Sequence, residues 1–476
     1  MRRAKIVCTI GPATESAEQI QALVDAGMDV ARLNRSHGAT EVHERVYKNV
    51  RAAAKASGRS VAVLVDLQGP KIRLGKFVDT KHELAVGDIF TITTEDVPGT
   101  KELVSTTHMG LPDDARVGDP ILIDDGRVLV RVTAIDGPRV VTRVEIGGPV
   151  SNNKGLNLPG VAVSVPAMSE KDEADLRWGL QIGADLIALS FVRSAADYDD
   201  VRRIMEEEGR IVPVIAKVEK PQAVENLAEI VDAFDGIMVA RGDLGVEMPL
   251  EQVPLVQKRA IELARRSAKP VIVATQVLES MISAPRPTRA EASDCANAVL
   301  DGADAVMLSG ETAMGDFPIE AVRTMARIIE NTEEFGAERI APLGSSPHTH
   351  GGAITRAAAE IGESLDVKYL VTFTQSGDSA RRMSRLRSTI PLLAFTPVTT
   401  VRNILSLSWG VQSYKVAGVA DTDGMVVQVD HTLRINGLAE VGDYVVIVSG
   451  APVGVRGTTN SILVHRVGEE SGYSRI

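Results

Sequence analysis

Short apolar runs rich in β-branched residues recur along the chain, and each is followed by a segment with helical periodicity. Runs of this kind are typical of parallel strands that are buried on both faces. Eight of them lie before residue 312: KIVCTI (5–10), DVARLN (29–34), VAVLVD (61–66), DLIALSFV (185–192), PVIAKVE (213–219), GIMVAR (236–241), PVIVATQ (270–276) and AVMLSGE (305–311). Eight strand–helix units predict an α/β fold of the TIM (β/α)8 barrel type.

The helices between these runs carry recognisable end signals. In SAEQIQALVDAG, Ser16 and Gln19 predict a capping box, and Gly27 predicts the end of the helix. In PQAVENLAEIVDAF, Pro221 is placed where a first helical turn tolerates proline.

One connection is far too long for a single helix. About 118 residues separate the third and fourth runs, and within 70–167 short alternating runs are divided by VGD, DDG and DGP turns. This pattern predicts a small antiparallel β-barrel inserted after the third strand. Since that strand ends at the catalytic face of a barrel, the insertion is placed to act as a lid.

A further unit follows the last barrel helix. The segment FGAERIAPLGSSPHTHGG (335–352) has the composition of a linker, and five more strand candidates follow, four of them alternating with helical segments. They are KYLVTFT (368–374), PLLAFT (391–396), VQSYKV (411–416), DYVVIVSG (443–450) and ILVHRV (462–467). We therefore expect a discontinuous barrel (1–69 and 168–335), an inserted lid (70–167) and a C-terminal open α/β domain (336–476).

Polar residues gather at the carboxyl ends of the predicted barrel strands, where a TIM barrel performs its chemistry. They are Arg32, Asn34, Ser36, Asp66, Lys71, Arg73, Lys217, Glu219, Arg241, Asp243, Thr275, Gln276, Ser309, Glu311 and Thr312. Lys217 and Glu219 are two residues apart on one strand and face the same way, which fits a structural ion pair or a substrate cation beside a metal ligand. Glu219 and Asp243, from adjacent strands, suit Mg²⁺. We expect Arg32, Arg73, Arg241 and Lys217 to converge on a phosphorylated, carboxylated substrate.

Composition narrows the function classes. The chain has 52 Lys and Arg against 63 Asp and Glu, a net charge of −11, and 16 aromatic residues, so no nucleic acid is expected as a partner. Its two cysteines, Cys8 and Cys295, form no metal motif and are expected to be inert core residues. The amino terminus lacks a signal-peptide pattern and no run is long enough to span a membrane, so we expect a soluble, cytoplasmic protein with no membrane partner. Walker and dinucleotide-binding fingerprints are also absent from the sequence.

The segment VIAKVEKPQAV (214–224) resembles the signature of the pyruvate kinase family. Further matching segments follow in family order along nearly the whole chain: KIVCTIGPA, DVARLNRSHG, DLQGPKIR, NNKGLNLPG, LSFVRS, MVARGDLGVE, KPVIVATQVLESM, PRPTRAEASDCANAVLDGAD and MLSGETA. The resemblance implies an enzyme that transfers the phosphoryl group of phosphoenolpyruvate to ADP, giving pyruvate and ATP, in the last step of glycolysis. It also implies allosteric control through the C-terminal domain and a homotetramer.

Residue roles follow from the same resemblance. It implies Mg²⁺, with Mn²⁺ as a substitute, on Glu219 and Asp243, and catalytic roles for Lys217, Arg32, Thr275, Ser309 and Glu311. Substrate binding is expected from Arg32, Lys217, Gly242, Asp243 and Thr275, and nucleotide binding from Asn34, His37, Arg73 and Lys154. Thr275 is expected at the substrate carboxylate, and Ser309 and Glu311 on the route of the proton to the enolate. Arg35 and Met314 depart from residues common in the family.

Lys71 is the most informative departure, because better-known members have Glu at this position and need K⁺. There the monovalent site uses positions that match Asn34, Ser36, Asp66 and the backbone of Leu67. We expect the Lys71 ammonium to replace that ion, so that K⁺ is not required. The alternative is a solvated lysine beside a site that still takes K⁺.

The loop in TFTQSGDSARR (372–382) matches the family's site for a phosphorylated effector, a sugar phosphate or AMP, at Thr374, Gln375, Ser376, Gly377 and Ser379. GVRGTTN (454–460) resembles its partner loop, and simple helix capping is the alternative. Two other functions are open at this point: a metal-dependent barrel lyase or aldolase acting on phosphoenolpyruvate or oxaloacetate, and a catalytically inactive metabolite sensor.

Overall fold

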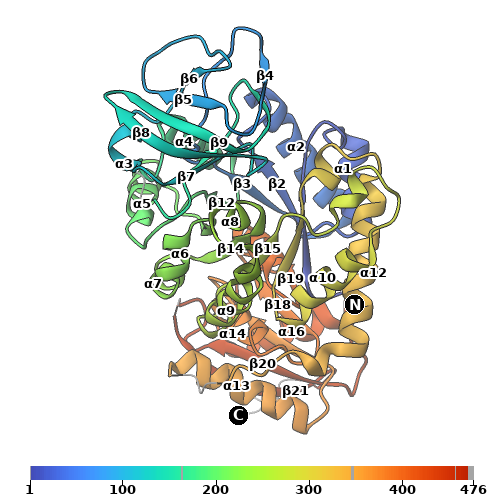
Figure 1. Ribbon diagram of the computed structural model, residues 1–476. Helices are drawn as coiled ribbons and strands as arrows, with labels where there is room; N and C mark the ends of the chain where they lie inside the picture. The colour runs from blue at the N-terminus through green and yellow to red at the C-terminus, as the bar shows by residue number, and fades with distance from the viewer. Residues whose placement is uncertain (1, 162–163, 345–347, 456, 470–476) are drawn as a thin grey trace.

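The computed structural model describes residues 2–161, 164–344, 348–455 and 457–469. The eight predicted runs form a closed barrel of parallel strands in the order β1-β16-β15-β14-β13-β12-β3-β2 (Figure 1). Their bounds are β1 (Lys5–Thr9), β2 (Val30–Asn34), β3 (Ala62–Asp66), β12 (Leu186–Leu189), β13 (Val214–Val218), β14 (Gly236–Ala240), β15 (Val271–Ala274) and β16 (Ala305–Leu308). Most strands end earlier than the predicted runs, so several polar residues lie in the loops that follow them.

Helices surround this barrel (Figure 1). They are α1 (Ala17–Ala26), α2 (Thr40–Ser57), α4 (Glu170–Ile182), α5 (Asp197–Glu207), α6 (Pro221–Glu225), α7 (Leu227–Ala233), α8 (Arg241–Glu247), α9 (Val253–Arg266), α10 (Arg289–Leu300), α11 (Gly310–Ala313) and α12 (Pro318–Gly336), with short 3₁₀ turns at Leu250–Gln252 and Glu279–Ile282. Pro221 is the first residue of α6, as expected. At the start of α1, the hydroxyl of Ser16 accepts from the backbone N–H of Gln19 at 3.2 Å, which is one of the two hydrogen bonds of the predicted capping box.

The barrel interior is filled by side chains that alternate along each strand. Val30, Leu64, Ile215 and Met238 belong to one buried interior cluster, which Leu407 of the C-terminal region joins. Their neighbours in sequence face outward and pack against the helices. The same alternation carries the inward rows onward to Arg32, Asp66 and Lys217, so three charged side chains meet at the carboxyl end of the interior.

The opposite end of the barrel has a repeating aspartate. Asp29, Asp185, Asp235 and Asp304 each directly precede a strand, and each carboxylate accepts a hydrogen bond from a backbone N–H of the neighbouring strand. The four donors are Ile6, Val63, Val214 and Val271, at 2.8, 2.8, 2.9 and 3.1 Å respectively. The aspartate before every second strand of the barrel therefore forms a hydrogen bond with the barrel strand that precedes it in sequence.

The inserted segment 70–161 forms a layer over one end of the barrel (Figure 1). Its elements are β4 (Lys81–Leu84), β5 (Ile89–Thr93), β6 (Leu103–Ser105), α3 (Leu111–Asp114), β7 (Pro120–Ile123), β8 (Val128–Asp136), β9 (Arg139–Ile146), β10 (Gly148–Ser151) and β11 (Leu156–Asn157). The strands form a six-stranded sheet in the order β11-β7-β8-β9-β5-β6 and a two-stranded sheet of β10 and β4. The sequence predicts one antiparallel barrel here; the structure divides the strands between two sheets, and β5 and β6 pair in parallel. We call residues 70–161 the lid.

The C-terminal sheet lies beyond the other end of the barrel (Figure 1). It has the order β19-β18-β17-β20-β21, with β21 antiparallel. Its elements are α13 (His350–Ser364), β17 (Tyr369–Phe373), α14 (Asp378–Ser384), β18 (Leu392–Thr396), α15 (Thr399–Ile404), β19 (Val411–Lys415), α16 (Thr422–Ile435), β20 (Tyr444–Gly450) and β21 (Thr459–Arg466), with 3₁₀ turns at Ala337–Arg339 and Leu405–Leu407. Residues 345–347 of the predicted linker and Arg456 of the partner loop lie outside the described residues. In the described chain, no helix combines the length and the apolarity that crossing a membrane requires.

Candidate active site

Lys217 is the centre of the charged cluster at the barrel mouth. It lies on β13 and is only 9% exposed. Its Nζ lies 2.9 Å from Oε1 of Glu219 and 3.3 Å from Oδ1 of Asp66, and it donates to the hydroxyl of Ser190 at 2.7 Å. A buried ammonium is stable only with such partners, since an unpaired charge in this position is strongly unfavourable.

Arg32 joins the cluster from β2. Its Nε donates to Oδ2 of Asp66 at 2.6 Å, and its Nη1 donates to the hydroxyl of Thr9 at 2.9 Å. Asp66 therefore holds two cations at once, one on each oxygen. This arrangement fixes Arg32 and Lys217 side by side, which suits recognition of an anionic substrate group.

The protonation states follow from these contacts. Burial lowers the pKa of Lys217, but Asp66 and Glu219 outweigh burial and raise its pKa above the ordinary value. Burial raises the pKa of Asp66, while Lys217 and Arg32 bring this pKa below its ordinary value. The pKa of Glu219 is raised by burial and by the nearby Asp243, against the opposing effect of Lys217. The ammonium is thus held charged at neutral pH.

Glu219 and Asp243 are the carboxylates that could hold a divalent cation. Glu219 follows β13, and its Oε2 accepts from the backbone N–H of Phe191 at 2.7 Å. Asp243 lies in the first turn of α8 and is partly exposed. The described residues contain no group of three or more His, Cys, Asp or Glu that could hold a metal by themselves. Two carboxylates fit Mg²⁺ nevertheless, because this ion commonly takes one or two protein carboxylates and completes its shell with substrate oxygens and water.

Thr275 and Gly242 meet beside this carboxylate pair. The backbone N–H of Gly242 donates to the Thr275 hydroxyl at 2.7 Å, and that hydroxyl donates to the carbonyl of Ala274. Thr275 and Gln276 both have positive φ, at 67° and 53°. Such conformations are unfavourable for residues other than glycine and concentrate at functional sites.

Arg241 does not join the cluster, contrary to the expectation. Its guanidinium forms two hydrogen bonds with the carboxylate of Asp294 on α10, at 2.6 and 2.7 Å, and donates to the carbonyl of Thr275. Its charged partner is therefore on α10 and not among Lys217, Asp66 and Glu219. The hydrogen bond from Arg241 to the Thr275 carbonyl helps to hold the backbone of Thr275 at its positive φ.

Ser309 and Glu311 lie together at the end of β16. The buried Glu311 carboxylate accepts from the backbone N–H groups of Ser309 and Leu278, at 2.7 and 3.1 Å. Burial raises the pKa of Glu311 in spite of these two donors. The Ser309 hydroxyl is buried without a hydrogen-bond partner among the described residues.

Lys71 has other partners than the sequence predicts. Its Nζ lies 3.8 Å from Asp243 and 3.7 Å from Asp125 at the lid turn, so the ammonium faces the metal-ligand candidate. In the predicted cation site, Asn34 accepts from the N–H of Ser36, and the Leu67 carbonyl accepts from Ser190. Lys71 belongs to the lid, and its ammonium lies between Asp125 of the lid and Asp243 of the barrel.

The nucleotide-binding candidates lie apart from Lys217. His37 is exposed, and its carbonyl accepts from His43. In the lid, Arg73 donates to the carbonyl of Asn153, and Lys154 donates to Asp124 at 2.8 Å. The described contacts do not join these side chains to one another.

Sequence reasoning missed three functional candidates: Ser190, Asp125 and Asp294. Ser190 and Asp125 carried a signal, since Ser190 is a polar residue near the carboxyl end of the predicted run 185–192, and Asp125 lies in the DDG turn at 124–126. Asp294 lies within a helix and carried none.

Comparison with known proteins decides the family. The family model described as pyruvate kinase, barrel domain matches residues 1–322, and the model described as pyruvate kinase, alpha/beta domain matches residues 352–465. The chain belongs to the pyruvate kinase family. A pyruvate kinase of Mycobacterium intracellulare is 58% identical over 98% of this chain and 99% of its own length, and one of Corynebacterium glutamicum is 56% identical over the full length of both. A solved pyruvate kinase structure from Cryptosporidium parvum superposes with a TM-score of 0.92 at 36% identity, covering 98% of this chain and 96% of that one.

As a pyruvate kinase, the chain transfers a phosphoryl group from phosphoenolpyruvate to ADP. The lyase and sensor interpretations are thereby set aside. The family assignment also gives a context for Arg35, one of the two departures: its guanidinium pairs with Asp175 at 2.6 Å and stacks over Trp178, so it is packed within the rim.

The effector candidates lie around a cavity in the C-terminal sheet. Thr374, Gln375, Ser376 and Ser379 line it from one side, and residues of the 449–459 segment line it from the other. The Thr374 hydroxyl accepts from the N–H of Gly377, which has a φ of 81°, and Ser379 bonds to Thr459 across the cavity. Asp378 pairs with Arg382, which offsets the negative charge that this residue brings to the loop.

Proposed function

We propose that Lys217 and Arg32 stabilise the phosphoryl group while it moves from phosphoenolpyruvate to ADP. The observation that supports this role is the buried ammonium of Lys217, held charged beside Arg32 by the shared carboxylate Asp66. Phosphoryl transfer needs little covalent participation by the protein, so pre-positioned charge in a water-poor site supplies most of the catalysis. Asp66 acts by positioning these two cations.

The metal belongs to the same proposal. Glu219 and Asp243 would hold Mg²⁺, or Mn²⁺ in its place. When bound, the ion would neutralise charge on the substrate oxygens. Thr275 and the N–H of Gly242, now bonded to each other, present a hydroxyl and a backbone donor to the substrate carboxylate. The buried pair of Ser309 and Glu311 lies on the proton route to the enolate, with Glu311 able to hold a proton because burial raises its pKa.

The nucleotide is assigned to the rim and the lid base. Asn34 and His37 would contact it from the barrel, and Arg73 and Lys154 from the lid. Closing the lid would bring the last two side chains over the mouth and exclude water from the transfer.

Lys71 takes the place of the monovalent cation in this proposal. Its ammonium lies 3.8 Å from Asp243 and supplies there the single positive charge that K⁺ would otherwise supply. The test is pyruvate formation from phosphoenolpyruvate, ADP and Mg²⁺ in K⁺-free Tris buffer, with and without KCl. We expect equal rates for the unchanged enzyme and a KCl requirement for Lys71→Glu. Lys76→Glu, the same charge change at an exposed lid lysine, is the matched control and should behave as the unchanged enzyme does.

Either of two results would contradict this part. If the unchanged enzyme is active only with KCl, it is a pyruvate kinase in which Lys71 does not replace the ion. If Lys71→Glu works equally well without KCl, the lysine has no such role.

Regulation completes the proposal. A phosphorylated effector, a sugar phosphate or AMP, would bind in the cavity lined by Thr374, Gln375, Ser376 and Ser379, with Gly377 shaping the loop. Three units, the barrel (1–69 and 168–335), the inserted domain (70–167) and the regulatory domain (336–476), would assemble into a cytoplasmic homotetramer. Adding effector should shift the phosphoenolpyruvate saturation curve to lower concentrations, and Thr374→Glu should abolish the shift by placing a carboxylate against the phosphate.

A further inference from the structure

A buried carboxylate on α8 joins the lid to the barrel. Glu247, the last residue of α8, is 3% exposed. Its Oε1 accepts from the side-chain amide of Asn157 at 2.6 Å and from Nζ of Lys220 at 2.5 Å. One oxygen atom therefore holds a lid residue and a barrel residue together.

The two barrel residues of this cluster adjoin the metal-ligand candidates. Lys220 directly follows Glu219, and Glu247 lies four residues after Asp243 on the same face of α8. A change at Glu247 therefore acts on the helix that carries one carboxylate and on the turn that carries the other.

Asn157 brings the lid into this arrangement. It lies on β11, paired to β7, so its position follows the lid sheet. Asn157 itself is 4% exposed, and its contact with Glu247 is shielded from water. Lys220 lies 5.6 Å from the centre of the Phe191 ring, and the Phe191 N–H donates to Glu219.

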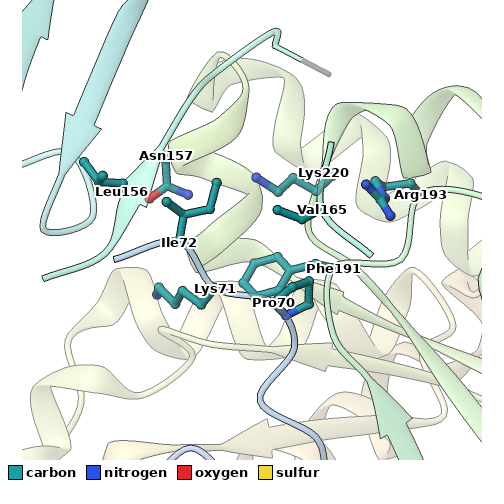
Figure 2. A pocket seen from close by; sticks show the side chains of 9 residues that line it. All are labelled: Pro70, Lys71, Ile72, Leu156, Asn157, Val165, Phe191, Arg193 and Lys220. Atoms are coloured by element: carbon teal, nitrogen blue, oxygen red, sulfur yellow. The ribbon is translucent and has the colours of Figure 1, made fainter. Parts of the chain in front are cut away.

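Figure 2 shows Asn157, Lys220 and Phe191 among the side chains that line one small pocket between lid and barrel. Asn157 and Leu156 enter from the lid, Lys220 extends its ammonium end toward them, and the Phe191 ring lies below Lys220 in this view. Lys71 touches Asp243 at the other end of α8. The lid thus contacts α8 at both ends, through Lys71 at the first turn and through Asn157 at the last.

We infer that Asn157, Glu247 and Lys220 position the two metal-binding carboxylates according to where the lid lies. The inference rests on the proposed assignment of Glu219 and Asp243 to Mg²⁺. With the lid seated, Asn157 and Lys220 fix the end of α8 and the turn after Glu219 in one arrangement. With the lid displaced, the buried Glu247 loses one of its two partners, and α8 is less firmly placed. Lid closure and metal affinity are therefore coupled.

A swapped pair tests this coupling. Asn157→Asp places a second carboxylate at hydrogen-bond distance from the carboxylate of Glu247. Glu247→Gln removes the negative charge with which Lys220 pairs. The double variant N157D/E247Q restores one amide, one carboxylate and the original net charge at the same place. Asn152→Asp is the matched control, because it makes the same substitution away from the barrel. Asn152 accepts a hydrogen bond from the backbone N–H of Phe77 within the lid.

Two measurements are made on each variant at a temperature where all are folded. The first is the Kd for Mn²⁺ in the absence of substrates, followed by electron paramagnetic resonance. The second is kcat and KM for ADP. We expect each single variant to weaken Mn²⁺ binding and to lower kcat/KM about tenfold, the effect of losing a hydrogen bond to a charged group. The double variant should recover to within about threefold, and Asn152→Asp should stay within about twofold of the unchanged enzyme.

The contradicting outcomes are distinguishable. Asp243→Asn must weaken Mn²⁺ binding; if it does not, the metal assignment fails, and the inference fails with it. If Asp243→Asn does weaken it but the double variant shows no recovery, the metal assignment stands and the coupling is wrong. Loss of thermal stability alone, with unchanged Kd and kcat/KM, would make the cluster purely structural and would also overturn the inference.

Discussion

The two ends of the barrel both bury carboxylates, but they use them differently. At the amino end, Asp29, Asp185 and Asp304 accept from backbone N–H groups of neighbouring strands, and each also pairs with an arginine. At the carboxyl end, Asp66 and Glu219 have Lys217 as a common side-chain partner.

This difference separates stability from chemistry. The aspartates at the amino end are part of the scaffold, because their backbone donors belong to strands and cannot turn toward a ligand without breaking a strand. Asp66 at the carboxyl end instead bonds to the side chains of Arg32 and Lys217, two donors that a substrate can recruit. The same residue type at the two ends of a strand therefore has two functions, and the predictions below separate them.

Glu219→Gln should have the largest effect on activity. The change removes the charge that balances Lys217 and the charge offered to Mg²⁺, so we expect kcat to fall about 10³-fold, equivalent to about 4 kcal/mol of barrier. Steady-state kinetics over a range of Mg²⁺ concentrations would measure it. A kcat within tenfold of the unchanged enzyme would remove Glu219 from the metal site.

Asp29→Asn should instead change stability. Arg2 and Arg59 would lose a buried anionic partner, and we expect the free energy of unfolding to drop by about 3 kcal/mol, with kcat within twofold. Urea denaturation at pH 7, together with the standard assay, measures both. A large loss of kcat in a fully folded variant would show that the amino end also serves catalysis.

The same variant makes a pH prediction. Burial raises the pKa of Asp29, but Arg2, Lys5 and Arg59 outweigh it, so the folded-state pKa lies below the ordinary value. The stabilising effect of Asp29 is therefore complete above the unfolded-state pKa of about 4 and is lost as the pH falls through the folded-state value. The stability difference between the unchanged enzyme and Asp29→Asn should shrink below pH 4; a difference that grows there would contradict the sign.

Ser190→Ala should cause the smallest free-energy change of the three variants. Its hydroxyl accepts from Lys217 and donates to the Leu67 carbonyl, so its loss loosens the ammonium without removing a charge. We expect kcat to fall about tenfold, or about 1.4 kcal/mol. Ser190→Thr, which keeps the hydroxyl, should retain more activity, and equal losses in both variants would show that shape rather than the hydrogen bond matters.

Periodicity alone was enough to predict the barrel. Each of the eight apolar, β-branched runs from KIVCTI to AVMLSGE contains one strand of the barrel. Nearly continuous apolar runs of this length are typical of parallel strands buried on both faces. The lid was less determined, since the parallel pairing of β5 with β6 depends on contacts that local alternation does not encode.

The candidate site was predicted in part. The sequence predicts that Arg32 and Lys217 converge, and in the structure both side chains pair with Asp66, a contact that was not predicted. The directions of Arg241 and Lys71 could not be predicted, because their partners, Asp294 and Asp125, come from segments whose position depends on the tertiary fold. Long side chains reach several places, and only the fold decides among them.

The most direct test compares Lys217→Met with Asp185→Asn, one variant from each end of the barrel. Both are assayed for transfer from phosphoenolpyruvate to ADP in a single turnover, at a temperature where circular dichroism shows both folded. We predict that Lys217→Met loses transfer by about 10³-fold, while Asp185→Asn, which weakens a contact to the N–H of Val63, transfers at the rate of the unchanged enzyme but unfolds at a lower temperature. Equal loss of transfer in both variants, or transfer by Lys217→Met within tenfold of the unchanged enzyme, would contradict the separation of the two ends.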